Sequence, residues 1–189
     1  MRIGNWGTFR KEWFLPGVLT VLALAQPAVN PHSQVISDFE KRVEEYLKIH
    51  KAANGELPKS KPTESPEILT RHQHDLAAKI KQRRGNAKLG DLFTSEIGTE
   101  FRRLMKIASQ GGNENRIKKS LEHAEPVVFQ PKLNESYPEG KPLQSTPPTL
   151  LMNLPKLPPE VEYRIIGRFL ILRDVDANLI VDYLPNAVP

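Results

Sequence analysis

The sequence predicts an α+β domain in which a group of helices precedes a three-stranded antiparallel β-meander. Three observations support this prediction: helical spacing of apolar residues over 33–109, crowded prolines over 126–159, and three closing runs rich in β-branched and aromatic residues. We therefore divide the chain into a signal peptide (1–25), a helical region (26–125), a proline-rich extended arm (126–159) and a β-meander (160–189). Residues 26–189 are expected to form one domain.

The first 25 residues have the order of a secretory signal peptide: basic residues, then an apolar run, then small residues at a cleavage site. The run extends from Trp13 to Leu24, and we expect cleavage between Ala25 and Gln26. A membrane-spanning helix needs about 20 apolar residues, whereas Pro16-Gly17 interrupts this run. An uncleaved anchor is therefore the second interpretation, and a buried cytosolic helix is the third. The preceding basic residues are Arg2, Arg10 and Lys11.

The chain has 189 residues and no cysteine, which excludes disulfides, thiolate metal sites, cysteine nucleophiles and a lipid-modified cysteine behind the signal. Cleavage after residue 25 leaves 24 basic and 21 acidic residues, a net charge of +3. We expect the exported protein to be free in the periplasm or outside the cell, without a transmembrane helix in its mature form. Small exported domains often rely on disulfides, so here one hydrophobic core has to provide the stability.

Residues 33–50 predict the first helix, because apolar residues recur there at spacings of three and four with charges between them. Ser33 and Ser37 are alternative capping residues at its start. The dipeptide Asn54-Gly55 is expected to stop the helix. Its apolar face comprises Ile36, Phe39, Val43, Tyr46 and Leu47.

Further helices are expected after a polar connector at residues 56–65. The second begins at Ser65-Pro66, where a capping hydroxyl precedes a first-turn proline, and ends near residues 83–86, where cations precede a glycine. The third covers about residues 94–109, and a short fourth helix is expected over residues 115–124. The apolar face of the second helix comprises Ile68, Leu69, His72, Leu76 and Ile80. That of the third comprises Ile97, Phe101, Leu104, Met105 and Ala108.

The segment from Pro126 to Pro159 combines many prolines with many large apolar residues. The prolines disfavour helix. A solvated linker is poor in apolar residues, whereas this segment carries aromatic and aliphatic side chains such as Phe129, Tyr137 and Leu150. We therefore expect an extended arm that lies across the helices and buries these side chains.

Three strands are expected at the end of the chain, at residues 161–166, 169–173 and 179–184. Gly167-Arg168 forms a tight first turn, and residues 174–178 form a longer second one. Because strand side chains alternate between faces, one face of the meander is apolar and is expected to cover the helices. That face comprises Tyr163, Ile165, Leu170, Leu172, Leu179 and Val181. The polar residues that need solvent or partners are Glu162, Arg164, Arg173 and Asp182.

Six segments of the mature chain together resemble a group of small exported bacterial proteins of unknown function. The resemblance implies a bacterial, Gram-negative envelope location. It implies no activity, ligand or catalytic residue. The segments are Asp91–Thr94, Phe101–Leu104, Tyr137–Gly140, Leu157–Arg164, Leu170–Asp174 and Ala177–Asp182.

Two patterns have residue types that bind metals, and neither predicts a metal site. Asp174-x-Asp176-x-Asn178 starts like a calcium loop, but Leu179 stands where that loop needs glycine and Pro185 where it needs glutamate. A β-turn made of good turn-forming residues accounts for the pattern. His72 and His74 are two positions apart on a helix, so their rings point in different directions.

Basic residues are concentrated between Arg71 and Lys119, where twelve basic and five acidic residues give a net charge of +7 and leave −4 for the rest of the mature chain. Ordinary solvated helix faces account for such a distribution. The alternative is a surface for lipid headgroups, acidic glycans or nucleic acid, and export makes nucleic acid the least expected partner. The candidate residues for this surface are Arg83, Arg84, Lys88, Arg102, Arg103 and Lys106.

The sequence lacks the motifs Gly-x-Ser-x-Gly and His-Glu-x-x-His and the phosphate-binding glycine loop. It therefore predicts no catalytic residue, cofactor or metal. The leading expectation is a non-enzymatic interaction or structural protein of the bacterial envelope, with an unknown envelope protein or an anionic envelope polymer as partner. The alternative is a binding module that contacts an anionic envelope component through the basic helices of residues 71–119. An enzyme of unfamiliar type is the second alternative.

Overall fold

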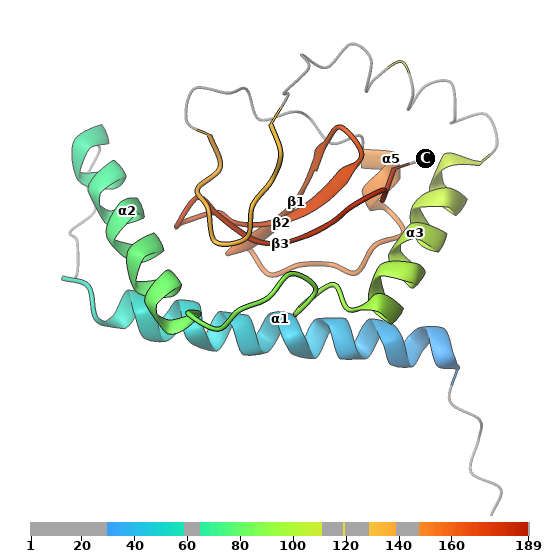
Figure 1. The fold of residues 1–189 in the computed structure, drawn as a ribbon, viewed down its shortest axis with the longest axis horizontal. Coiled ribbons are helices and arrows are strands. Elements are labelled where there is room, and N and C mark those ends of the chain that lie inside the picture. Colours follow the sequence, from blue (N-terminus) through green and yellow to red (C-terminus); the bar gives the residue numbers. More distant parts are fainter. Residues whose placement is uncertain (1–29, 59–64, 111–118, 120–128, 139–147, 189) are drawn as a thin grey trace, which may run out of the picture.

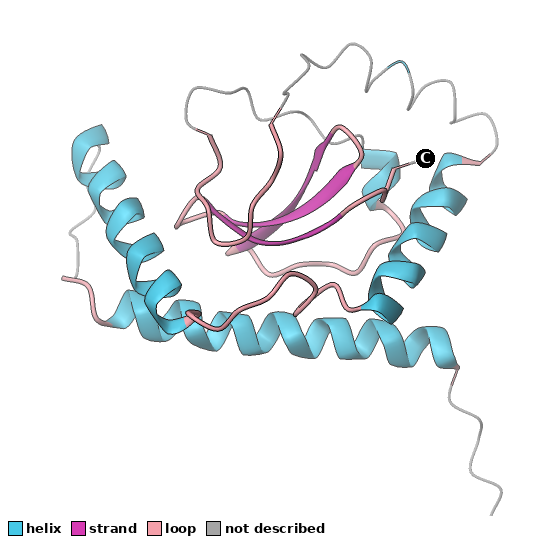
Figure 2. Cartoon of the chain, in the orientation of Figure 1, coloured by secondary structure: helices cyan, strands magenta, loops and turns pink. Residues whose placement is uncertain are grey.

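The computed structural model of the chain describes residues 30–58, 65–110, 119, 129–138 and 148–188. A long helix forms the base of the fold, a three-stranded sheet lies above its middle, and a further helix rises at each end (Figures 1 and 2). The elements are α1 (Pro31–Gly55), α2 (Pro66–Arg83), α3 (Ser95–Ser109), α5 (Pro148–Leu151), β1 (Val161–Ile166), β2 (Phe169–Asp174) and β3 (Leu179–Leu184).

Helix α1 begins earlier and ends later than the sequence predicted. Asn30 is the N-cap, since its side chain accepts the backbone N–H of His32, and Pro31 occupies the first helical position. The two serines expected as caps therefore lie inside the helix. The helix extends past residue 50 and ends at Gly55, where the dipeptide Asn54-Gly55 was expected to stop it. The buried face comprises Phe39, Val43, Tyr46, His50 and Ala53.

Helix α2 begins after Ser65 with Pro66 in its first turn, as predicted. Only the second half of its apolar face is buried. Leu76 and Ile80 are fully buried, whereas Ile68 and Leu69 are 46% and 55% exposed. The prediction that the whole stripe packs is therefore wrong for the first half. The reason is geometric: α2 contacts α1 near its C-terminal end (Figure 1), whereas its first half faces the turn between β2 and β3 across an open hollow that Leu69 and Val175 line.

Helix α3 confirms its prediction closely. Thr94 is the N-cap, and its hydroxyl accepts the backbone N–H of Ile97. Phe101 points into an aromatic cluster where its ring centroid lies 4.7 Å from that of Phe39 and 5.3 Å from that of Phe93. Tyr163 of β1 extends this cluster from the sheet, 6.1 Å from Phe101. The main core is thus closed between α1, α3 and one face of the sheet.

The sheet is antiparallel with the order β1-β2-β3, which confirms the predicted α+β class and the predicted meander. The expected apolar face does belong to the main core with α1 and α3. One irregularity was not predicted. Leu172 pairs with Asp182 but Arg173 pairs with Ile180, so the register skips Val181 and leaves it in a β-bulge.

The described parts of the proline-rich arm take two different places. Residues 129–138 lie on the sheet face opposite the helices, where Tyr137 packs in a second apolar cluster with Ile166, Ile171 and Ile180. Residues 148–151 form the short helix α5, with Pro148 at its start, so the expectation that this segment contains no helix is wrong there. Leu150 is buried in the main core.

Two expected elements fall outside the described residues: the signal peptide and, apart from residue 119, the fourth helix at 115–124. Within the part of the chain that the structure describes, no helix is both long enough and apolar enough to cross a bilayer.

Candidate functional site

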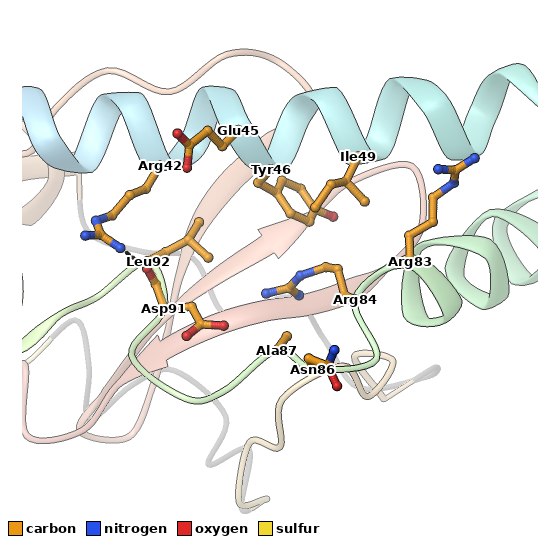
Figure 3. Close-up of a pocket in the computed structure, with 10 residues that line it drawn as sticks. All are labelled: Arg42, Glu45, Tyr46, Ile49, Arg83, Arg84, Asn86, Ala87, Asp91 and Leu92. Atoms are coloured by element: carbon orange, nitrogen blue, oxygen red, sulfur yellow. Dashed lines mark hydrogen bonds between the residues drawn. The ribbon is translucent and has the colours of Figure 1, made fainter.

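A groove lies between α1 and the loop that joins α2 to α3, with β3 behind it (Figure 3). Its volume is about 360 Å³. We call it the arginine groove because three of its lining residues are arginines, one from α1 and two at the end of α2. The lining residues are Arg42, Glu45, Tyr46, Ile49, Arg83, Arg84, Asn86, Ala87, Asp91 and Leu92.

Arg84 is the central cation of the groove and is only 6% exposed. Its Nη1 donates to Asn134 Oδ1 at 2.6 Å, and its Nη2 donates to the backbone carbonyl of Val181 at 3.0 Å. Val181 is the bulge residue of β3, so its carbonyl is available to a side chain. The guanidinium also lies over the ring of Tyr46, with Cζ 5.2 Å from the ring centroid. These contacts hold Arg84 in one position.

The charge of Arg84 has no direct ion pair within the described chain. No carboxylate of the described residues lies within 4.0 Å of its guanidinium, and both of its hydrogen-bond partners are neutral. Burial lowers the pKa of Arg84, while the charges of Tyr46, Asp182 and Asp91 raise it. A guanidinium is protonated throughout the physiological pH range, so Arg84 carries a positive charge. A buried charge without a direct ion pair is costly, which makes Arg84 a candidate anchor for an anion.

Asp182 is a buried carboxylate on β3 that the backbone satisfies. It is 0% exposed and accepts the N–H groups of Gly90, Leu92 and Phe93 at 3.1, 2.9 and 2.9 Å, as well as that of Tyr183 at 2.9 Å. Burial raises the pKa of Asp182, and these N–H groups oppose the rise. The bonds fix the loop that forms one wall of the groove.

Asp174 is the second buried carboxylate, at the end of β2. Its Oδ2 accepts the Tyr46 hydroxyl and contacts His50 Nδ1, both at 2.6 Å, and its Oδ1 accepts the N–H of Ala177. The hydrogen bond to Asp174 raises the pKa of His50, although burial opposes this. Burial and the Asp174 charge raise the pKa of Tyr46 well above its ordinary value. Tyr46 thus contacts Asp174 with its hydroxyl and Arg84 with its ring.

The other two arginines of the groove are paired. Arg42 donates to the Asp38 carboxylate at 2.9 Å. It also donates to the backbone carbonyl of Asp91 at 2.8 Å (Figure 3). Arg83 forms an ion pair with Glu56, which also contacts Lys79 at 3.2 Å. The rim therefore has positive and negative groups in pairs, in contrast to Arg84.

The six residues of the predicted basic surface are not brought together. Arg83 and Arg84 line the groove, and Lys88 is exposed in the loop that follows. The other three lie on α3, which stands at the opposite end of α1 from α2 (Figure 1). Arg102 donates to the carbonyl of Pro185, and Arg103 pairs with the buried Glu100. Lys106 is exposed in the last turn of α3.

The two patterns with metal-binding residue types have other roles. Asp174 accepts a hydrogen bond from Tyr46 of α1, and Asp176 is exposed. The side-chain oxygen of Asn178 accepts from Arg173, and its side-chain nitrogen donates to the backbone carbonyl of Tyr137. Their oxygens therefore serve a turn, as the sequence predicted. Among the described residues, no group of three or more histidines and carboxylates is arranged to hold a metal ion, and His72 and His74 belong to none.

Sequence reasoning missed Arg42 and Tyr46 as residues of this site. They are four positions apart in α1, and that spacing puts two side chains on the same helix face. This spacing was the sequence signal that could have identified the pair.

We found no protein-family model, no curated protein and no solved structure that matches the chain.

Proposed function

We propose that the chain is a non-enzymatic interaction protein of the bacterial cell envelope, and that the arginine groove is its binding site for an anionic group. One observation carries the proposal: Arg84 is buried and rigidly held, yet no carboxylate of the described chain pairs with it. A bound anion would supply the missing counter-charge in a place of low dielectric, where charge-assisted hydrogen bonds are strong. The proposed anion site is the arginine groove alone, and no residue of α3 lines it.

A non-enzymatic role is supported by the surroundings of the buried histidine. His50 Nδ1 contacts Asp174, and Nε2 lies 3.6 Å from Asp176. Both ring nitrogens thus face carboxylates of the chain, whereas a catalytic histidine has to present one nitrogen to a nucleophile or substrate. The Asp174–His50–Tyr46 cluster therefore joins α1 to the end of β2.

The binding proposal is tested by retention of the purified protein on four immobilised anionic groups: lipopolysaccharide, an acidic wall polymer, a benzoate and a phenyl phosphate. At least one of them should retain the protein, and the variants are compared on that one. The groove variant Ala87→Phe should be retained at least tenfold more weakly than the unmodified protein. The matched control Lys106→Gln, which removes an exposed cation from α3, should be retained like the unmodified protein. Equal retention of Ala87→Phe and the unmodified protein would contradict a site in the groove.

Export is the second part of the proposal, and the order of residues 1–25 supports it. Fractionation of cells that produce a C-terminally tagged chain should find the processed form outside the cytoplasm. Ala25→Arg should block processing, because the peptidase needs a small residue there. Normal processing of this variant would contradict cleavage after Ala25. A chain found only in the cytoplasm would contradict the envelope location.

A protein partner is a second candidate function, favoured by the first half of α2. Ile68 and Leu69 are exposed there on a helix that rises from the body of the fold (Figure 1), and exposed apolar groups are typical of interaction surfaces. A photo-cross-linker at position 69 should capture an envelope protein in living cells. The same probe at the exposed Lys106 is the control, and equal capture from both positions would count against α2.

A further inference from the structure

We infer that the ligand of the arginine groove is a small molecule with one carboxylate or phosphate on an apolar body, and that it is not an anionic polymer. This inference rests on the proposed function and narrows it. It follows from the hydrogen-bond capacity of Arg84, the charges of the rim and the apolar part of the groove.

Arg84 has donors for one planar anionic group. A guanidinium has five N–H donors, and the described chain uses two of them, on Asn134 and Val181. The remaining three have no acceptor among the described residues. Since the hydrogen bonds to Asn134 and Val181 hold the guanidinium in place, these N–H groups are preorganised for the bidentate geometry in which arginine binds carboxylate and phosphate.

The rim opposes a polymer with many negative charges. Glu45 and Asp91 add two carboxylates to the groove, while Arg42 and Arg83 are held by Asp38 and Glu56. A polyanion needs several accessible cations along its path, and like charges at the rim repel it. The strongly basic stretch that the sequence displays is thus divided in space, and one buried cation remains as the anchor.

The groove also offers apolar surface beside the cation. Ile49 and Leu92 line it together with Ala87 and the ring of Tyr46. Its volume of about 360 Å³ lies at the lower end of the range for small-molecule sites, about 300–1,000 Å³. An aromatic or short aliphatic body fits this space once the anionic group lies against Arg84.

The inference is tested by NMR on the full-length protein labelled with ¹⁵N, through the side-chain Nε–H resonance of Arg84, which Arg84→Met identifies by its loss. Benzoate, phenyl phosphate, inorganic phosphate and lipopolysaccharide are titrated in turn. Benzoate or phenyl phosphate should shift the resonance saturably, and at least one should bind at least tenfold more tightly than inorganic phosphate. Whichever of the two binds more tightly identifies the anionic group as carboxylate or phosphate.

Two groove-filling variants keep the test independent of Arg84. Ala87→Phe and Asn86→Phe should each weaken binding of the better probe at least tenfold while the Arg84 resonance stays close to its unliganded position. Two variants are used so that a folding defect in one of them does not decide the result. Lys106→Gln should bind the probe normally.

The outcomes separate the inference from the proposed function. If lipopolysaccharide shifts the Arg84 resonance and neither small probe does, the small-ligand inference is overturned while an anion site in the groove stands. If no anion shifts it, both are overturned. Unchanged affinity in both groove-filling variants would likewise remove the groove as the site.

Discussion

The buried carboxylates and the buried arginine of this protein differ in their hydrogen-bond and ion-pair partners, although all of them lie where the sheet meets α1 and the α2–α3 loop. Asp174 and Asp182 receive donors from the chain itself, a tyrosine hydroxyl, a histidine and backbone N–H groups. Arg84 receives two neutral acceptors and no carboxylate within 4.0 Å among the described residues. The comparison teaches that burial alone does not single out a candidate site, and that a buried charge without a direct ion pair is the more informative feature.

Loss of the Asp174 carboxylate should have the largest effect on stability. Asp174→Ala removes the partner of His50 and of the Tyr46 hydroxyl, and breaking one side of a buried ion pair costs about 4 kcal/mol of unfolding free energy. Urea unfolding measures the change. Asp176→Ala, at a neighbouring exposed carboxylate, should cost less than about 1 kcal/mol. Equal losses of unfolding free energy in the two variants would contradict a special role of the buried carboxylate.

Loss of the Asp182 carboxylate should rank second. Asp182→Ala leaves the N–H groups of Gly90, Leu92 and Phe93 without their acceptor, and unsatisfied buried donors should cost about 3 kcal/mol in all. Amide hydrogen exchange should accelerate at Leu92 and Phe93 and much less in α3. Uniform acceleration over the whole chain would show that Asp182 does not act on the groove wall in particular.

The Asp174 cluster should make stability depend on pH. The pKa of His50 is raised above its unfolded value of 6.5 by Asp174, with Asp176 and Glu160 also facing it. The stabilisation is therefore complete below pH 6.5 and is lost as pH rises through the folded pKa. Urea midpoints between pH 5 and pH 9 should fall over that window in the unmodified protein. The decline should disappear in His50→Gln, and its persistence there would assign it to another group.

Loss of the arginine should have the smallest effect on stability. Arg84→Met loses the hydrogen bonds to Asn134 and Val181, but it also removes a buried charge that lacks a counter-ion. These effects oppose each other, so the free energy of unfolding should change by no more than about 1 kcal/mol. A loss similar to that of Asp174→Ala, measured by the same urea unfolding, would mean that Arg84 is mainly structural.

The sequence predicted the meander and its core face because a strand side chain alternates strictly, so Leu170 and Leu172 had to share a side. It did not predict the groove, because that depends on contacts between distant segments. Tyr46 and Asp174 are 128 positions apart, and nothing local links them. The composition also could not predict that Arg83 is exposed while the adjacent Arg84 is buried. That difference arises from the β3 bulge, which aims a carbonyl at Arg84.

The central claim, that Arg84 is left open to an external anion, is tested most directly by unfolding the protein at increasing concentrations of benzoate and, separately, of phenyl phosphate, with the ionic strength held constant by sodium chloride. The tighter-binding of the two probes decides the outcome. A ligand that binds only the folded state stabilises it by about 2.7 kcal/mol at a hundred times its dissociation constant. The account predicts this rise in the unmodified protein and in Lys106→Gln, and none in Ala87→Phe or Arg84→Met. An equal rise in all four proteins, or a rise in none, would contradict it.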